Sequence, residues 1–186
     1  MLRNDIEALA ARLLLAERAE RSIDVQYYLL HADLTGYVFV EQLHKAADRG
    51  VRVRILLDDI TTEGHDPGLV ALDSHPNIEI RIFNPFSRAM PRLWNFVVDF
   101  DRVNHRMHNK SMTFDNQATI VGGRNIGDEY FDARADMNYN DLELFAVGPW
   151  CKKSRLSSIP IGTAPPSFPC KHCSAPQNRR PWSDCE

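Results

Sequence analysis

The chain has 186 residues, 44% of them hydrophobic, which fits one globular domain with a buried core. No stretch reaches the roughly 18 to 20 consecutive apolar residues of a membrane span, and Asp5, Glu7 and Arg12 exclude a secretory signal at the N-terminus. The net charge is −3 and residues 151–186 carry +4, which leaves −7 for residues 1–150 and argues against a nucleic-acid binder.

Helical and strand patterns alternate along the first part of the chain. Asn4 followed by Glu7 is typical of a capping box, and the apolar spacing after it predicts a helix over about residues 5–21. SIDVQYYLL then predicts a buried strand. A second helix is expected to open at Thr35 and Gly36 and to stop at Gly50.

The next segments complete the pattern. VRVRILLDD (51–59) predicts a strand, residues 66–74 a short helix, and IEIRIFN (78–84) a third strand. KSMTF (110–114) and ATIVGG (118–123) predict a hairpin, and DLELFAVG (141–148) a last strand. This order indicates an α/β fold with a layered mixed, largely parallel sheet flanked by helices.

A cluster of reactive residue types lies around the hairpin. His108 and Lys110 are two residues apart at the start of a strand, so both side chains are expected on the same side of the sheet. Histidine can act as a nucleophile or proton carrier, and lysine supplies positive charge for an anionic oxygen. Gly122 and Gly123 let backbone approach a ligand, and Asn125 offers an amide donor. Together these residues indicate a phosphodiester site, although each alone is more simply explained as surface or turn.

The ordered set His108-x-Lys110, Asp115 and Gly122-Gly123-x-Asn125 closely resembles the HKD signature of the phospholipase D superfamily. The stretches SIDVQYYLL, AADRGVRVRILLDD, HPNIEIRIFNPF, DFDRVNHRMHNK and GGRNIGDEYF are similar to its bacterial cardiolipin synthase C-like branch. The resemblance covers about residues 5–149, and Gly123 stands where many members have serine. We therefore expect residues 1–149 to form a phospholipase D-like half-domain, with the HKD motif at about 102–129.

The resemblance implies phosphatidyl transfer or phosphodiester hydrolysis on phospholipids through a phosphohistidine, without a metal or other cofactor. Lys110 and Asn125 would hold phosphate oxygens, and Asp115 would organise the hairpin turn. Asp141 or Glu143, on one face of the last strand, could orient the histidine ring. The protein would then work in the cytoplasm or peripherally at the bacterial inner membrane, and residues 85–100 are a candidate for lipid contact or for core packing.

Other charged residues keep two interpretations. His105 would point to the opposite face of the strand and is interpreted as structural or exposed. Arg106 and Arg124 could contact anionic headgroups, but isolated arginines are usually surface charge. Asp58 and Asp59 end a strand at the edge where α/β sites gather, so they could hold a hydroxylated headgroup or cap a helix.

The mechanism implied by the resemblance needs two HKD copies, and this chain has one. A second HKD half or a homodimer would therefore be required for a complete site. The alternatives are a homodimeric one-motif phosphodiesterase or nuclease, with the acidic body speaking against DNA, and a non-catalytic fragment.

The composition changes after residue 149. All four cysteines and six of the eleven prolines lie there, including Cys170-x-x-Cys173. A zinc site and a disulfide-stapled tail are two interpretations. The third, which we favour, is a frameshifted and largely disordered tail, because one restored nucleotide would allow a helix of the kind that the family has here. We also expect the chain to be clipped at its start, since Met1 falls almost on the first helix.

Overall fold

The computed structural model describes residue 2, residues 4–59, 66–86 and 104–148, and residue 151. The expectations for residues 87–100 and for the tail, including the Cys170 and Cys173 pair, lie outside the described residues. The elements are α1 (Asp5–Arg18), β1 (Ser22–Tyr27), α2 (Leu34–Asp48), β2 (Arg52–Asp58), α3 (Asp66–Asp73), β3 (Ile78–Phe83), β4 (Ser111–Phe114), β5 (Ala118–Gly122), the 3-10 turn η1 (Asp128–Tyr130) and β6 (Glu143–Val147).

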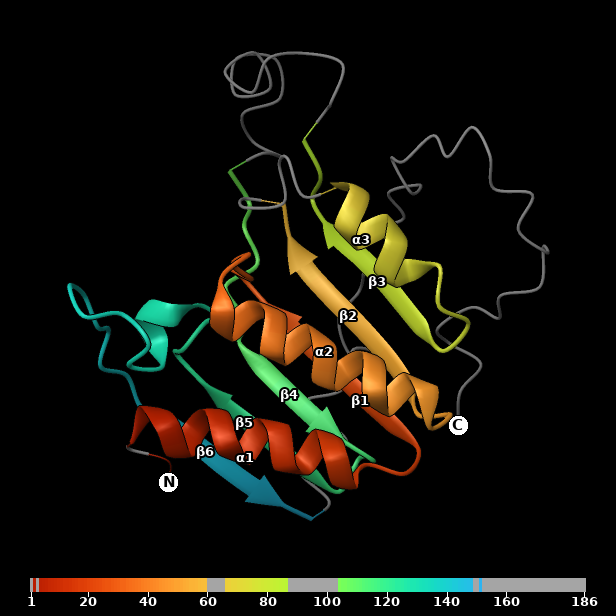
Figure 1. Cartoon of the computed structure of the whole chain (residues 1–186), viewed down its shortest axis with the longest axis horizontal. Coiled ribbons are helices and arrows are strands. Elements are labelled where there is room, and N and C mark those ends of the chain that lie inside the picture. The colour runs from red at the N-terminus through yellow and green to blue at the C-terminus, as the bar shows by residue number, and fades with distance from the viewer. Residues whose placement is uncertain (1, 3, 60–65, 87–103, 149–150, 152–186) are drawn as a thin grey trace.

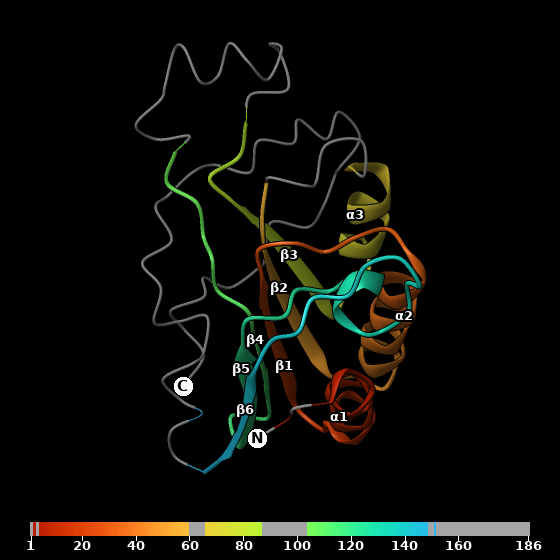
Figure 2. The ribbon, with the colours of Figure 1, turned by 90° about the vertical axis from the view of Figure 1, so that its left-hand side faces the viewer.

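The strands form one sheet in the order β3-β2-β1-β4-β5-β6. β1, β2 and β3 are parallel, whereas β4, β5 and β6 join by antiparallel pairs. The three helices lie together on one face of this sheet (Figures 1 and 2). The predicted mixed α/β fold is confirmed, with the parallel part limited to the first three strands.

Alternation along the strands separates two chemically different faces of the sheet. Ile23, Val25 and Tyr27 of β1 belong to the apolar core that packs against the helices. The residues between them include Asp24, which makes a buried bidentate ion pair with Arg54 of β2 at 2.6 and 2.7 Å. The helix-covered face therefore supplies the hydrophobic core, and the opposite face carries paired polar groups.

Asp115 sets where α1 ends and how the hairpin turns. The expected helix over residues 5–21 is too long, because the structure ends it at Arg18. The backbone N–H groups of Glu20, Arg21 and Ser22 donate instead to the Asp115 carboxylate at 2.8 to 2.9 Å. Asp115 and Asn116 both have positive φ, 51° and 57°, as a tight hairpin turn requires, so the predicted turn is confirmed.

The second helix begins slightly earlier than expected. Asp33 is its N-cap and accepts from the Gly36 N–H at 2.8 Å, so the helix starts at Leu34. The other Asp33 oxygen accepts from the N–H of Asp128 at 2.8 Å. The Asp128 carboxylate in turn accepts from the N–H of Thr35, also at 2.8 Å. This exchange fastens the loop after β5 to the start of α2.

Candidate functional site

The antiparallel pairing of β1 and β4 places the HKD segment. Gln26 pairs with Ser111, so the residues that precede β4 run past the carboxyl end of β1 (Figure 2). The imidazole of His108 lies 4.7 Å from the ring of Tyr28, centroid to centroid, and is exposed. The ammonium of Lys110 lies 5.2 Å from the centroid of the same ring. Both residues lie just before the strand, and Tyr28 is the side chain that they share.

Lys110 is held by its surroundings in one place. Its side chain is only 6% exposed, and its Nζ donates to the backbone oxygen of His108 at 3.0 Å. Burial lowers the pKa of this ammonium below its ordinary value, and the negative charge of Asp141 acts in the opposite direction. The result is a fixed positive charge next to His108 with few competing partners.

Asn125 is buried beside the same segment of β1. Its Oδ1 accepts from the N–H of Leu29 at 3.1 Å, and its Nδ2 donates to the Tyr130 hydroxyl at 3.0 Å. An amide nitrogen carries two hydrogens, and among the described residues only one of them has an acceptor. The second can donate to a ligand. The backbone contact fixes the orientation of the amide, which suits a donor to an anionic oxygen.

Gly122 and Gly123 are required by the strand that follows. A Cβ at Gly122 would lie 2.6 Å from the Leu142 carbonyl oxygen. A Cβ at Gly123 would lie 1.9 Å from Oδ2 of Asp141, so any side chain there must displace that carboxylate. The glycine that replaces the family's usual serine therefore makes room for Asp141.

The two candidate carboxylates for orienting His108 have different environments. Asp141 is exposed, and its Oδ1 accepts from the Leu142 N–H at 2.6 Å. In the described part of the chain the His108 imidazole makes no hydrogen bond to it, so the orienting role stays a prediction. Glu143 is buried and ion-paired with Arg12 and, at 3.5 Å, with Arg124. The Glu143 carboxylate is therefore bound by two arginines in the interior of the protein.

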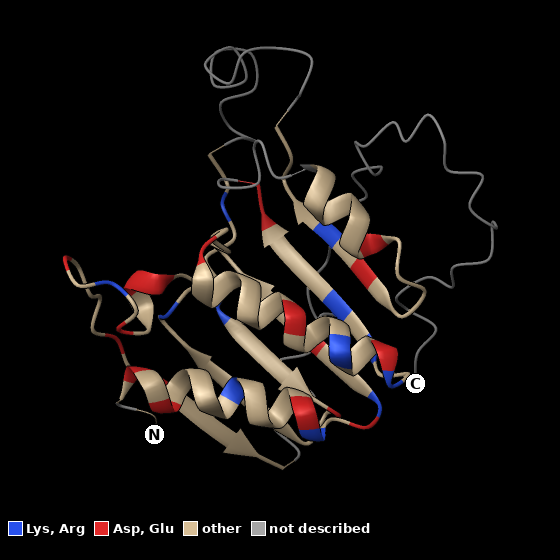
Figure 3. Ribbon diagram, viewed as in Figure 1, with Lys and Arg blue, Asp and Glu red and all other residues tan. Residues whose placement is uncertain are grey.

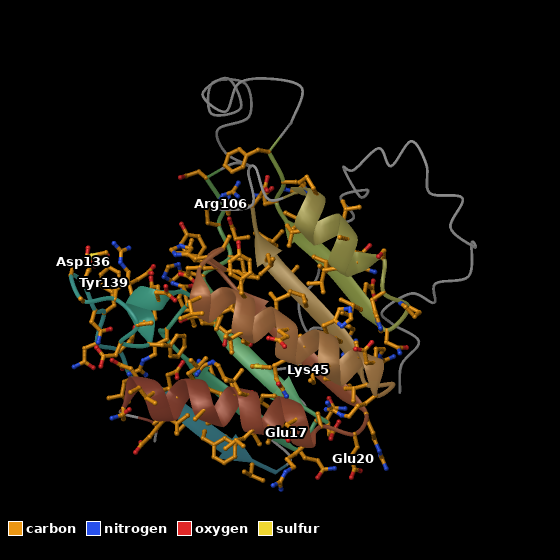
Figure 4. The ribbon with its side chains drawn as sticks, viewed as in Figure 1. Glu17, Glu20, Lys45, Arg106, Asp136 and Tyr139 are labelled. Carbon is orange, nitrogen blue, oxygen red and sulfur yellow. The ribbon has the colours of Figure 1, made fainter. Side chains whose placement is uncertain are left out.

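The expectation of ordinary surface charge is wrong for both arginines, because each guanidinium is paired with a carboxylate of the protein. Arg124 is fully buried and paired with Asp5. Arg106 donates to Asp58 at 3.0 Å and lies over the Phe86 ring at 4.4 Å (Figure 4). Neither side chain is ordinary surface charge, since a buried carboxylate or an aromatic ring faces each of them.

Asp58 and Asp59 are fully buried and serve as acceptors for the chain around the site. Asp58 accepts from the N–H of Met107, the residue before His108, at 2.9 Å, and Asp59 accepts from the N–H of Phe86 at 2.6 Å. Met107 also packs against Leu56 of β2. Of the two open interpretations, neither a headgroup site nor a helix cap describes these contacts. They anchor the segment that leads to His108.

Sequence reasoning missed Tyr28 and the contact of Asp58 with Met107. It predicted correctly that His105 is exposed, but this residue lies in a loop and not on a strand. His105 is exposed, and its backbone oxygen accepts from Asn84 at 2.7 Å. Tyr28 could have been found from the strand period, because Tyr27 belongs to the core and the next residue faces the other way.

Comparisons with known proteins indicate one family. Residues 14–141 match the family described as cardiolipin synthase, PLD-like domain. The chain is 52% identical over 148 residues to cardiolipin synthase C of Escherichia coli, covering 80% of this chain but 31% of that protein.

Two solved structures share the fold. Phosphatidylserine synthase of Haemophilus influenzae superposes with a TM-score of 0.62 at 14% identity, over 82% of this chain and 34% of that one. NucT of Helicobacter pylori superposes with a TM-score of 0.58 at 16% identity, over 81% of this chain and 84% of that one. The family match covers most of the chain, and the fold agrees with it. The protein therefore belongs to the cardiolipin synthase, PLD-like domain family of the phospholipase D superfamily.

Proposed function

We propose that His108, Lys110 and Asn125 form one half of a phospholipase D-type site that transfers or hydrolyses the phosphodiester of a phospholipid. The observation that carries the proposal is the arrangement at the end of β1. An exposed imidazole lies beside a buried ammonium, and a fixed amide lies on the neighbouring backbone. These groups are a nucleophile or acid, a counter-charge and a donor for the oxygens of one phosphate.

In the proposed reaction one histidine attacks phosphorus and forms a phosphorus–nitrogen bond. The bond from phosphorus to the leaving oxygen breaks, and a second histidine gives that oxygen its proton. An acceptor alcohol or water then attacks phosphorus, the second histidine takes its proton, and the phosphorus–nitrogen bond breaks. His108 supplies one of these two groups, and Lys110 stabilises the negative oxygens in both steps.

The second histidine must come from another HKD unit. The chain spans about a third of the length of the E. coli relative, which leaves room there for such a unit. We propose that residues 1–149 act together with a second half of this kind, and that contact with the membrane is peripheral. Among the described residues no helix has the length and apolar character needed to cross a bilayer.

A second candidate is a homodimer in which two copies of the chain supply the two histidines. NucT, whose fold this chain shares, is matched over 84% of its own length by this one-motif chain. Acidic and basic residues are interspersed along the described helices and strands (Figure 3), and the net charge of the body is negative, which disfavours DNA as the substrate of such a dimer.

A chimera tests the main proposal. The matched segment of the E. coli relative is replaced by residues 1–149 of this chain, and phosphatidyl transfer is measured with phospholipid vesicles. We expect the chimera to be active and the isolated chain to be inactive as a monomer. A folded chimera without turnover overturns the proposal, whereas activity of the isolated chain that rises with dimer concentration supports the homodimer instead.

A further inference from the structure

Two histidines and an aspartate meet at the end of the sheet opposite to His108. His44 and Asp48 lie one turn apart near the end of α2, and His75 lies in the loop between α3 and β3. These segments precede the amino ends of β2 and β3, whereas the candidate catalytic residues lie at the carboxyl end of β1. Lys45, next to His44, marks the position on α2 in Figure 4.

The three side chains already face one another. Nδ1 of His44 lies 3.2 Å from one Asp48 oxygen, and Nε2 of His75 lies 3.3 Å from the other. The two imidazole rings are 5.1 Å apart in an edge-to-face arrangement, and the three ligand atoms all lie within 4.8 Å of one another. Zinc bonds of about 2.0 to 2.1 Å in a tetrahedron separate neighbouring ligand atoms by about 3.3 Å.

We propose that His44, Asp48 and His75 form a binding site for a divalent transition-metal ion of the zinc class. The two short contacts use different Asp48 oxygens, but one ligand atom from each residue lies within 4.8 Å of the others. Rotation of the exposed His44 and Asp48 side chains can shorten these separations to those of a tetrahedral site. Two imidazoles with one carboxylate are a donor set that suits Zn²⁺, Co²⁺ or Ni²⁺ rather than Mg²⁺. Water completes the coordination, and the ion links α2 to the loop that enters β3.

The two neighbouring cationic side chains are bound to other partners. The ammonium of Lys45 is paired with Glu41 at 2.7 Å, and Arg49 donates to the backbone oxygens of Ala16 and Glu17 at 2.8 and 2.9 Å. In these contacts neither cation occupies the Asp48 carboxylate, which contacts the two histidines.

One contact limits the affinity. The N–H of Asn77 donates to Nδ1 of His75 at 3.2 Å, which holds the imidazole proton on Nε2, where it faces Asp48. When Nε2 binds a metal, that proton leaves and Nδ1 takes up a proton in place of the Asn77 contact. We therefore expect a site of modest affinity, which fills when free metal is supplied.

A second group of possible ligands in the described chain is a poorer site. His31, Asp33 and Glu129 include a single imidazole. Both Asp33 oxygens already accept backbone hydrogen bonds, from Gly36 and from Asp128. This group therefore serves as the comparison in the experiment.

The test uses the whole purified chain after treatment with a chelator. Thermal unfolding is followed with and without Zn²⁺, and Co²⁺ is titrated while its visible absorption is recorded. The variants are His44→Gln and His75→Gln, with His31→Gln as the matched control. A Cys170→Ser/Cys173→Ser variant removes the closely spaced thiol pair of the tail, because thiolates would also bind these ions.

Zn²⁺ at a hundred times its dissociation constant is expected to raise the unfolding temperature by about 5 to 10 °C in the wild type, the His31 variant and the cysteine variant. His44→Gln and His75→Gln should each weaken binding by about tenfold or more. The proposal is overturned by an unshifted wild type, by a shift that survives both substitutions, or by one that disappears with the cysteines. His44 is exposed on a helix, so His44→Gln remains decisive if the His75 variant fails to fold.

Discussion

Replacing Glu143 with glutamine should destabilise the protein strongly, because its carboxylate is paired with Arg12 and Arg124 in the interior. Glu143 is 1% exposed and accepts from both terminal nitrogens of Arg12, which is equally buried. Arg124 also lies 3.5 Å from this carboxylate. Burial acts to lower the pKa of Arg12, but the influence of Tyr27 and Glu143 outweighs it, so the guanidinium stays charged.

The magnitude follows from the number of charges left behind. The substitution removes one negative charge between two buried guanidiniums, and removing one partner of a buried ion pair costs about 3–5 kcal/mol. Arg12 keeps its hydrogen bonds to Tyr27 and Ala8, so we expect the lower part of that range, about 3–4 kcal/mol. With a urea slope of about 2–3 kcal/mol/M, the midpoint should fall by about 1–2 M.

Urea unfolding followed by circular dichroism measures the change. Asp136→Asn is the matched control, because Asp136 pairs with Arg134 at 3.0 Å on the surface, where such a pair contributes at most about 1 kcal/mol (Figure 4). An Arg12→Met/Glu143→Leu double variant should recover part of the lost stability, since it removes both charges of the pair. A Glu143→Gln protein within about 1 kcal/mol of the wild type would refute the reasoning.

Three further predictions concern the site and the hairpin. Asp115→Ala removes the acceptor of three backbone N–H groups and should lower the free energy of unfolding, measured in urea, by about 3 kcal/mol. A decrease below about 1 kcal/mol would show that water replaces the carboxylate as acceptor. Gly123→Ser displaces only the end of the Asp141 side chain, so stability should change by less than about 1 kcal/mol. The pKa of Lys110, followed by NMR, should fall further, and an unchanged pKa contradicts the electrostatic influence of Asp141. Because the pKa of Lys110 is lowered in the fold, its protonation opposes folding at neutral pH, and this effect disappears as the pH rises through the folded pKa toward 10.5. Lys110→Met should therefore be at least as stable as the wild type near pH 7 and should lose this pH dependence. A variant that is less stable than the wild type at pH 7 would contradict the prediction.

Local sequence signals predicted the elements well. The Asn4 cap, the hairpin turn at Asp115 and Asn116, and the buried face of β2 are each determined by residues close together in the chain. The end of α1 was misplaced because Asp115, about 95 positions away, captures the amides that would have continued the helix. Helix propensity cannot register a competitor at that distance.

In the candidate site, too, some features were visible in the sequence and others depend on contacts made only in the fold. The order of His108, Lys110 and Asn125 is visible in the sequence, and so is the family that it indicates. The anchoring of Met107 by Asp58, 49 positions apart, depends on how β2 and the HKD segment pack. The burial of Arg124 likewise depends on Asp5 and Glu143, which approach it only in the folded chain. Charge type alone therefore suggested surface roles for groups that are interior partners.

The most direct test of the central claim is the turnover of the active chimera with His108 replaced. His108→Asn keeps a polar side chain of similar reach but cannot attack phosphorus or carry the proton, so phosphatidyl transfer should fall by at least about a thousandfold. His105→Asn, three positions earlier and also exposed, should stay within about tenfold of the unmodified chimera. Equal activity of the two variants would contradict the assignment of His108 to the site.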